Sequence, residues 1–209
     1  MLEFKNVRVY DLRESIISCR NAMRLSLPEY TDKEFEDSLV RAIKLVKANN
    51  NKQGIHCHAN FRTGIRVSFD MKYTQYITKQ FQRYHWFDYV SSASLMHRIT
   101  KMDFEHCCNK YVTDESKQQM KKLIEEYNSL VSNKGDYIDD VIYTAWMRVI
   151  SNCPMGTELF VRVSTNYEQL ATIYRQRKHH KLKEDYAAFT KMVESLPYAN
   201  ELIIGNYEV

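Results

Sequence analysis

Gln80-Phe81-Gln82-Arg83-Tyr84-His85 is the most informative stretch of the chain, and Arg177 accompanies it far downstream. Just before the stretch, apolar and polar residues alternate from Ile65 to Met71, which is the period of a half-buried strand. Residues 74 to 85 then have helical spacing, so the stretch is expected to end a helix that follows a strand. The chain around it therefore mixes both kinds of element.

Cations, hydroxyls and aromatic rings gather within and after this stretch. Arg83 and His85 stand beside Trp86, and His97 and Arg98 follow a short way on. A guanidinium offers phosphate a planar fork, and it also stacks on aromatic faces. The cluster suits an anionic, planar ligand such as a nucleotide or a flavin. The alternative is a helix end with a solvated charged face and aromatic core anchors.

The whole chain has the pattern of one α+β domain, with neither repeats nor linkers. A helix that Thr31 or Asp32 can cap is predicted to end in the turn Asn49–Gly54. Asn166 precedes another helix, which runs to about Arg177. The other expected elements are strands at 7–10 and 158–163 and helices at 12–24, 115–131, 136–150 and 181–196.

Composition excludes several classes of protein. The 209 residues are 44% apolar, carry a net charge of +4 and include only five glycines and three prolines. These values exclude disorder and give no nucleic-acid signature. No apolar run reaches the roughly 18 residues of a membrane helix, so we expect a cytoplasmic protein. No glycine-rich phosphate loop is present, and a cofactor must be held by side chains and helix ends.

The five cysteines are Cys19, Cys57, Cys107, Cys108 and Cys153. None forms a Cys-x-x-Cys pair, so a zinc ribbon is excluded and reduced, buried thiols are expected. His56-Cys57-His58 has no second ligand pair at useful spacing. We therefore predict no metal site.

A basic run extends from Arg175 to Lys183. Such a run is usually a solvated face, and the alternative of RNA or an acidic partner is weakened by the acidic Glu184 and Asp185. Arg177 differs from its neighbours, because it shares a helical face with the apolar Ile173. An arginine at the edge of a buried stripe needs a partner, either a carboxylate or a ligand anion.

In their order and spacing, these motifs resemble the flavin-dependent thymidylate synthases from residue 7 to about residue 190. Arg24-Leu25-Ser26 resembles the family's Ala-Arg-Val-Ser, and His58-Ala59-Asn60 stands where the family has His-x-Thr. Lys79 to Arg83 is similar to Arg-Gln-Trp-Phe-Arg. The resemblance implies flavin contacts for Ser26, His58, Asn60 and Arg83, and a nucleotide contact for Gln80.

The family's Arg-His-Arg is replaced here by Arg83-Tyr84-His85. His85 would take an arginine's place on the cofactor side, and it is cationic only when protonated. Arg98 is similar to the family arginine that binds the dUMP phosphate. Ser94 would substitute for the family's accompanying serine, since Met96 occupies that position.

Further along, Arg148 and Pro154 resemble the family's Arg…Leu-Pro segment, which implies a nucleotide contact for Arg148. Residues 166 to 177 are similar to Asn-x-Arg-Ser-Leu-x-x-Phe-Leu-x-Leu-Arg. This match implies a cofactor contact for Asn166 and makes Arg177 the catalytic arginine that lies against the pyrimidine. The family's following Ala-Gln-Trp-Glu-Ile-Arg is missing.

The resemblance implies a single domain over residues 1–209, with a central, mostly antiparallel sheet flanked by helices. It implies a methyltransferase that methylates dUMP at C5, with FAD as cofactor and methylenetetrahydrofolate and NADPH as co-substrates. The expected partners are a pyrimidine nucleotide and further copies in a homotetramer, with neither nucleic acid nor membrane.

Three other functions stay open. One is a related enzyme that hydroxymethylates dUMP or dCMP, which would suit phage nucleotide metabolism. Another is a homologue that binds a nucleotide or a flavin without catalysis. The third is a partner-binding α+β domain whose similarity to the family arises by chance.

Overall fold

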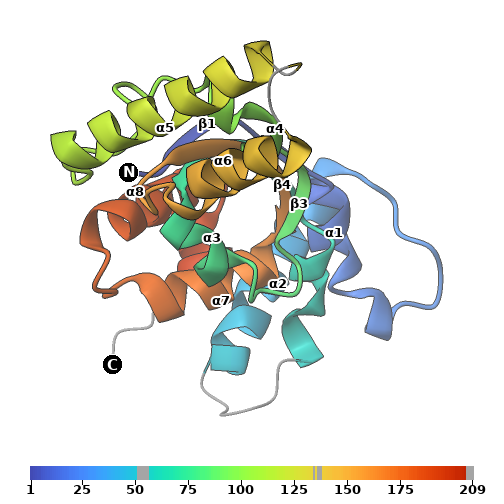
Figure 1. The fold of residues 1–209 in the computed structure, drawn as a ribbon. Coiled ribbons are helices and arrows are strands. Elements are labelled where there is room, and N and C mark those ends of the chain that lie inside the picture. Colours follow the sequence, from blue (N-terminus) through green and yellow to red (C-terminus); the bar gives the residue numbers. More distant parts are fainter. Residues whose placement is uncertain (51–56, 134, 136–137, 206–209) are drawn as a thin grey trace. The chain divides into compact units, whose positions relative to one another are not determined.

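The computed structural model describes residues 1–50, 57–133, 135 and 138–205, and Figure 1 shows their course. The strands are β1 (Glu3–Tyr10), β2 (Arg66–Thr74), β3 (Asp88–Ser92) and β4 (Glu158–Asn166). The α-helices are α1 (Leu12–Ser18), α2 (Asp32–Asn50), α3 (Gln75–Phe81), α4 (Leu95–Arg98), α5 (Asp114–Ser132), α6 (Asp139–Ser151), α7 (Tyr167–Arg177) and α8 (Lys183–Glu194). Short helical turns are η1 (Asn21–Met23), η2 (Cys57–Thr63), η3 (Ile99–Lys101) and the π-helical η5 (Asn200–Ile204).

The strands form one four-stranded antiparallel sheet in the order β1-β2-β4-β3, and helices flank it. The predicted α+β fold class is thus confirmed. Alternation fixes the faces of the central β2, because Val67, Phe69 and Met71 are all fully buried. The edge strand β3 is mostly exposed. It therefore has no alternation of buried apolar and exposed polar residues, which is the pattern that indicates a strand in a sequence.

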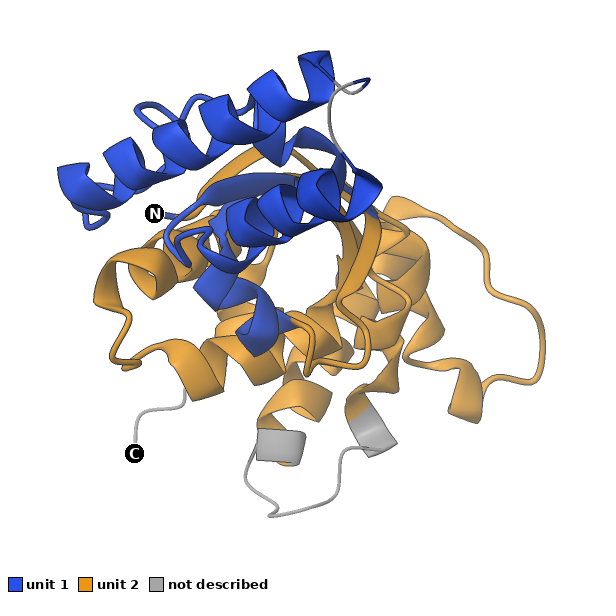
Figure 2. Ribbon diagram, viewed as in Figure 1, with its two compact units in different colours: residues 1, 72–81, 91–161 blue, residues 2–71, 82–90, 162–209 orange. Residues whose placement is uncertain are grey.

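The chain divides into two compact units that interleave along the sequence (Figure 2). Unit 1 comprises residues 1, 72–81 and 91–161, and unit 2 comprises residues 2–71, 82–90 and 162–209. Three strands pass from one unit to the other, because β2, β3 and β4 each contain a unit boundary. The single domain over 1–209 remains a prediction.

Unit 1 has its own apolar core where η3, α5 and α6 pack together. The predicted helix 115–131 is confirmed as α5, and Thr113 caps it by accepting the amide of Ser116. The predicted helix 136–150 begins later, at Asp139. Of its expected apolar face, Ala145 is buried and Ile142 half-buried, whereas Ile138 and Val141 are exposed and Val149 completes the buried face. The core residues are Ile99, Phe104, Met120, Leu123, Ile124 and Val149.

Unit 2 is built where α1, α2 and η2 pack together and where α7 packs on η2, η5 and α8. The predicted cap of α2 is confirmed, since Thr31 accepts the amide of Glu34. Asn166, which was expected to precede a helix, caps α7 by accepting the amide of Gln169. The predicted helix 12–24 is shorter, because α1 ends at Ser18 and a separate turn follows. The expected turn after α2 begins later than predicted, since α2 continues to Asn50, and its remainder lies outside the described residues.

The predicted helix 74–85 ends at Phe81, so the signature residues 82–85 lie in a turn before β3. No helix within the described ranges is long and apolar enough to cross a membrane.

Candidate functional site

The turn between α3 and β3 lines a pocket of about 460 Å³ within unit 2. Arg83 and His85 are exposed, whereas the Tyr84 ring is half-buried. Arg83 has no ion-pair partner among the residues that the structure describes. Asp88 also lines the pocket and forms no ion pair with Arg83, so the guanidinium beside aromatic rings can take an anionic, planar group. The lining residues are Gln82, Arg83, Tyr84, His85, Phe87, Asp88 and Tyr89.

Trp86, the residue after this turn, is fixed to the start of α7. Its amide donates to Oε1 of Gln169 at 3.2 Å, and its carbonyl accepts the hydroxyl of Thr165 at 2.7 Å. Gln169 in turn donates its own amide to Oδ1 of Asn166 at 2.8 Å. The buried cap of α7 therefore sets the position of the turn through long-range hydrogen bonds.

Arg177, at the last turn of α7, is held by aromatic side chains. Its Nε donates to the Tyr84 hydroxyl at 2.9 Å, and that hydroxyl donates to Oε1 of Gln176, also at 2.9 Å. The guanidinium lies 5.8 Å from the ring centroid of Tyr84 and 5.5 Å from that of Tyr186. The predicted cofactor turn and the predicted catalytic arginine thus meet within unit 2.

The partners of Arg177 leave its positive charge uncompensated. Within residues 1–50, 57–133, 135 and 138–205, no carboxylate pairs with it. Its contacts among these residues are a neutral hydroxyl and two ring faces, and the ligand anion that we expected as the other possible partner stays a prediction. Such contacts orient a guanidinium without neutralising it, so its charge remains available to an anion.

The pKa values of Tyr186 and His180, two groups beside Arg177, are shifted in the directions that favour their neutral forms. Burial raises the pKa of Tyr186 to about 12, although the Arg177 cation acts to lower it. Burial also lowers the pKa of His180, and the positive charges of Arg177 and Lys181 lower it further. The His180 ring lies 4.7 Å from that of Tyr186. At neutral pH the arginine therefore carries the positive charge of this aromatic cluster.

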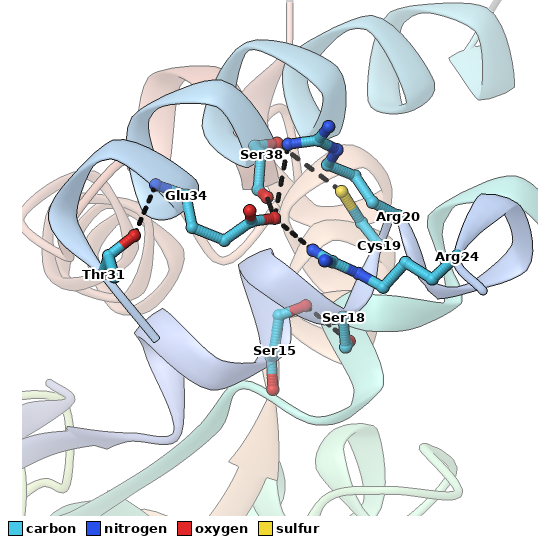
Figure 3. Close-up of polar contacts among 8 residues, drawn as sticks. All are labelled: Ser15, Ser18, Cys19, Arg20, Arg24, Thr31, Glu34 and Ser38. Atoms are coloured by element: carbon cyan, nitrogen blue, oxygen red, sulfur yellow. Dashed lines mark hydrogen bonds and ion pairs between the residues drawn. The ribbon is translucent and has the colours of Figure 1, made fainter. Parts of the chain in front are cut away.

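The predicted flavin contact Ser26 lies in an exposed segment after α1, and an ion-pair network secures the chain on either side of it (Figure 3). Arg24 and Arg20 both reach Oε1 of Glu34 on α2, and the Ser38 hydroxyl donates to the same oxygen at 3.4 Å. The hydrogen bond from Arg24 is the main cause of the lowered pKa of Glu34. Ser26 itself keeps a side chain open to solvent.

Asn60, another predicted flavin contact, lines two cavities of unit 2. One, of about 250 Å³, also involves Trp86 and Gln169, so it adjoins the anchored turn. The other, of about 860 Å³, extends to α2, where Arg41 and Lys44 have no ion pair among the described residues. The side chain of His58 lies outside what the structure describes.

Asn166 is buried, with 1% of its surface exposed, and its carboxamide oxygen caps α7. This cap alone accounts for an asparagine at that position. The cofactor contact that the sequence implied for Asn166 remains a prediction.

Four predicted nucleotide contacts belong to unit 1. Gln80 is half-buried on α3, and Ser94 caps α4 by accepting the amide of His97. Arg98 is exposed and its guanidinium lies 5.3 Å from the ring centroid of Phe160. Arg148 on α6 pairs with Glu126 of α5 at 2.8 Å, so a phosphate at Arg148 would have to compete with that carboxylate. The nucleotide roles of these residues remain predictions.

Sequence reasoning missed three residues that shape the site. Gln169 anchors Trp86, Gln176 accepts from Tyr84, and Tyr186 supports Arg177. Gln169 and Gln176 act across long sequence separations, and Tyr186 belongs to a different helix from Arg177, so no local pattern indicates these contacts. No three metal-ligating side chains are grouped to hold a metal ion in the described portion of the chain.

The fold recurs in enzymes that act on nucleotides. The flavin-dependent thymidylate synthase ThyX from Helicobacter pylori, complexed with FAD and dUMP, matches with a TM-score of 0.62 at 14% identity, over 96% of this chain and 98% of its own. A second structure of that enzyme with FAD and dUMP gives 0.57 at 16% identity, over 97% and 96%. The UMP/dUMP methylase PolB from Streptomyces cacaoi, bound with 5-Br dUMP, gives 0.53 at 11% identity, over 93% and 88%.

No family model matches the sequence, and no curated protein matches it either. At the identities found, the likeness to the solved structures establishes a ThyX-like fold. The activity has to be argued from the residues of the site.

Proposed function

We propose that this chain is a divergent flavin-dependent thymidylate synthase, which methylates dUMP at C5. Methylenetetrahydrofolate would be the carbon donor and NADPH the reductant. The observation that carries the proposal is the uncompensated cation of Arg177, held by Tyr84 and Tyr186 next to the signature turn. The shared fold supports it, because the similar structures hold FAD and dUMP or a bromo analogue of dUMP.

Arg177 would bind the pyrimidine and stabilise negative charge that develops on it. A fixed cation lowers the barrier most when it need not reorganise during the reaction. The hydrogen bond to Tyr84 and the two ring faces provide that fixation. Arg98, Arg148, Gln80 and Ser94 would bind the rest of the nucleotide, with Arg98 and Arg148 contacting phosphate.

The turn residues would hold the flavin. Arg83 offers a cation without an ion-pair partner among the described residues, and its pocket is lined by aromatic rings, which fit an anionic, planar group. Ser26, His58, Asn60, His85 and Asn166 would complete the contacts. FAD supplies hydride transfer when it is bound. The protein orients the nucleotide and supplies charge, and no cysteine nucleophile is required.

His85 would take the place of the family's second arginine on the cofactor side, and an imidazole is cationic only when it is protonated. His85→Ala should therefore lower flavin retention, whereas His85→Arg should restore the family's cation and raise it. Equal flavin retention by His85→Ala at every pH would exclude the role.

A second candidate is another modification of the same base, such as hydroxymethylation. The replacement of the family tripeptide by Arg83-Tyr84-His85 and the fold shared with a UMP/dUMP methylase both favour it. Mass spectrometry of the product formed from dUMP and from dCMP separates the two reactions. A homologue that binds these ligands without turnover would give no product in either assay.

The decisive experiment is the absorbance spectrum of the desalted protein between 300 and 550 nm, with and without added FAD and dUMP. Retained flavin bands that shift with dUMP support the synthase and lead to a tritium-release assay. A colourless protein that ignores FAD contradicts the proposal. Light scattering of the same sample tests the homotetramer that we expect from the family resemblance.

A further inference from the structure

Three cysteines of unit 1 lie around one buried hydroxyl. Cys153, just after α6, has its Sγ 3.3 Å from Oγ1 of Thr157, which is fully buried. Cys108 has its Sγ 4.0 Å from the same oxygen, and Cys107 is its neighbour in sequence. The sequence predicted buried thiols, but these three are half-buried and gathered from segments far apart in the chain.

The backbone holds the two segments together, so the cluster is part of the folded unit. The backbones of Cys108 and Thr157 pair in an isolated antiparallel β-bridge, and the amide of Glu158 donates to the carbonyl of Cys107 at 2.7 Å. Nε2 of Gln75 donates to the Cys153 sulfur at 3.1 Å. The sulfurs therefore lie in a defined polar setting at the edge of the unit 1 core.

The three thiols differ in their readiness to ionise. The hydrogen bond from Cys107 lowers the pKa of Cys108 to about 7, and the Thr157 hydroxyl and Lys117 act in the same direction. The pKa of Cys107 is raised by that hydrogen bond and by burial, and burial raises the pKa of Cys153. These contacts favour the thiolate form at Cys108 over Cys107 and Cys153, and the thiolate is the nucleophilic form of cysteine.

We propose that Cys108 is a site of oxidation by hydrogen peroxide and that Cys153 converts its oxidised form to a disulfide. The Cys108 thiolate attacks one peroxide oxygen, an S–O bond forms, the O–O bond breaks, and hydroxide leaves and takes up a proton as water. The Cys153 thiol then loses its proton and attacks the sulfenic sulfur. An S–S bond forms, the S–O bond breaks, and a second water leaves.

Cys153 suits the second step better than Cys107 for a geometric reason. Consecutive Cα atoms are about 3.8 Å apart across a trans peptide, whereas disulfides need about 4.4–6.8 Å. A Cys107–Cys108 bond would therefore strain the backbone. Cys153 and Cys108 approach the same Thr157 oxygen from different segments, so the spacing of consecutive Cα atoms does not restrict this pair.

The test uses the full chain without added nucleotide or flavin, so its outcome is independent of the proposed enzymatic function. After a tenfold excess of hydrogen peroxide, free-thiol titration of the unfolded protein should show a loss of two of its five thiols. Trypsin would place Cys108 and Cys153 in different peptides, 102–110 and 149–162. Mass spectrometry should find these peptides joined, two hydrogens lighter than their sum.

Variants identify the role of each thiol, with circular dichroism to confirm that each one folds. Cys108→Ser should abolish the crosslink. Cys153→Ser should leave a sulfenic acid on Cys108 that dimedone traps. Cys19→Ser is the matched control and should change nothing, because Cys19 lies in unit 2 and burial raises its pKa.

Cys107→Ser should slow the reaction and still give the joined peptides. A disulfide confined to peptide 102–110 would overturn the pairing. Peroxide reactivity of Cys108 no greater than that of Cys19 would overturn the site itself.

Discussion

Two arginines of unit 2 show how differently one fold can treat the same side chain. Arg62 is 1% exposed, donates to the carbonyl of Leu202 at 3.0 Å and forms an ion pair with Glu168. Arg177 is half-buried and is held by the Tyr84 hydroxyl and two ring faces. The first charge is compensated inside the protein, whereas the second is oriented and left uncompensated. This difference separates an arginine that stabilises the fold from one that is available to a ligand.

The largest effect is expected from removing the compensated charge. Arg62→Met should leave the Glu168 carboxylate without its cation, and breaking a buried pair in this way costs about 3–5 kcal/mol. Urea unfolding followed by circular dichroism measures the loss. The double variant Arg62→Met, Glu168→Met should recover much of it. A loss below about 1 kcal/mol for the single variant would show that Arg62 is not a structural arginine.

Arg177→Met should have the opposite balance, with a small effect on stability and a large one on ligand binding. A hydrogen bond to a charged group is worth about 1.5–3 kcal/mol, so dUMP affinity should fall by about 10- to 100-fold. Calorimetric titration of dUMP measures the affinity, and urea unfolding the stability. Arg175→Met, an exposed change on the same helix, is the matched control. Unchanged affinity would place the nucleotide elsewhere.

Tyr84→Phe tests whether orientation of Arg177 matters as well as its charge. The variant keeps the ring beneath the guanidinium and removes the hydroxyl that accepts from Nε. This hydrogen bond is charge-assisted but acts on the nucleotide only through the orientation of Arg177, so we expect dUMP affinity to fall by only about threefold to tenfold. Gln176→Leu, which leaves the bond between Arg177 and Tyr84 in place, should cost less. Equal losses in both variants would argue against an orienting role for the Tyr84 hydroxyl.

Local patterns in the sequence predicted much of the fold because they act over a few residues. The alternation from Ile65 to Met71 predicted the buried strand β2, and Thr31 was predicted as a helix cap. The helix predicted over 74–85 is shorter, because α3 ends at Phe81. The residues after it form a turn in which Tyr84 and Trp86 bind residues of α7. Such long-range contacts override local helix propensity.

For the site too, local motifs predicted some residues, whereas contacts from distant parts of the fold were not predictable. Arg83, His85 and Arg177 were predicted as site residues from their motifs, and the structure brings the turn of Arg83 and His85 to Arg177. One of the two rings that hold Arg177 could not be predicted, because Tyr186 belongs to another helix and has no motif around it. Sequence indicates which groups carry charge, whereas packing decides whether that charge is compensated.

The smallest effect that we expect is the contribution of His180, which lies beside Arg177, to the pH dependence of stability. His180 accepts the amide of Leu182 on Nδ1 at 3.2 Å, which requires that nitrogen to be unprotonated. Its ring faces Tyr186, and Arg177 and Lys181 are the nearby cations that, after burial, lower its pKa. The unfolded chain therefore takes up this proton more readily than the folded one. Its contribution to stability is complete above about pH 6.5 and is lost as the pH falls below that value.

We expect the free energy of unfolding to fall by less than about 1 kcal/mol from this source between pH 7 and pH 5, since His180 is only partly buried. Urea unfolding across that range should show a flatter pH dependence for His180→Gln than for the unaltered chain. His179→Gln, an exposed neighbour, is the matched control. Parallel curves for both variants would mean that His180 can be protonated beside Arg177 at little cost. The cluster would then tolerate a second positive charge, and the contrast with the compensated Arg62 would weaken.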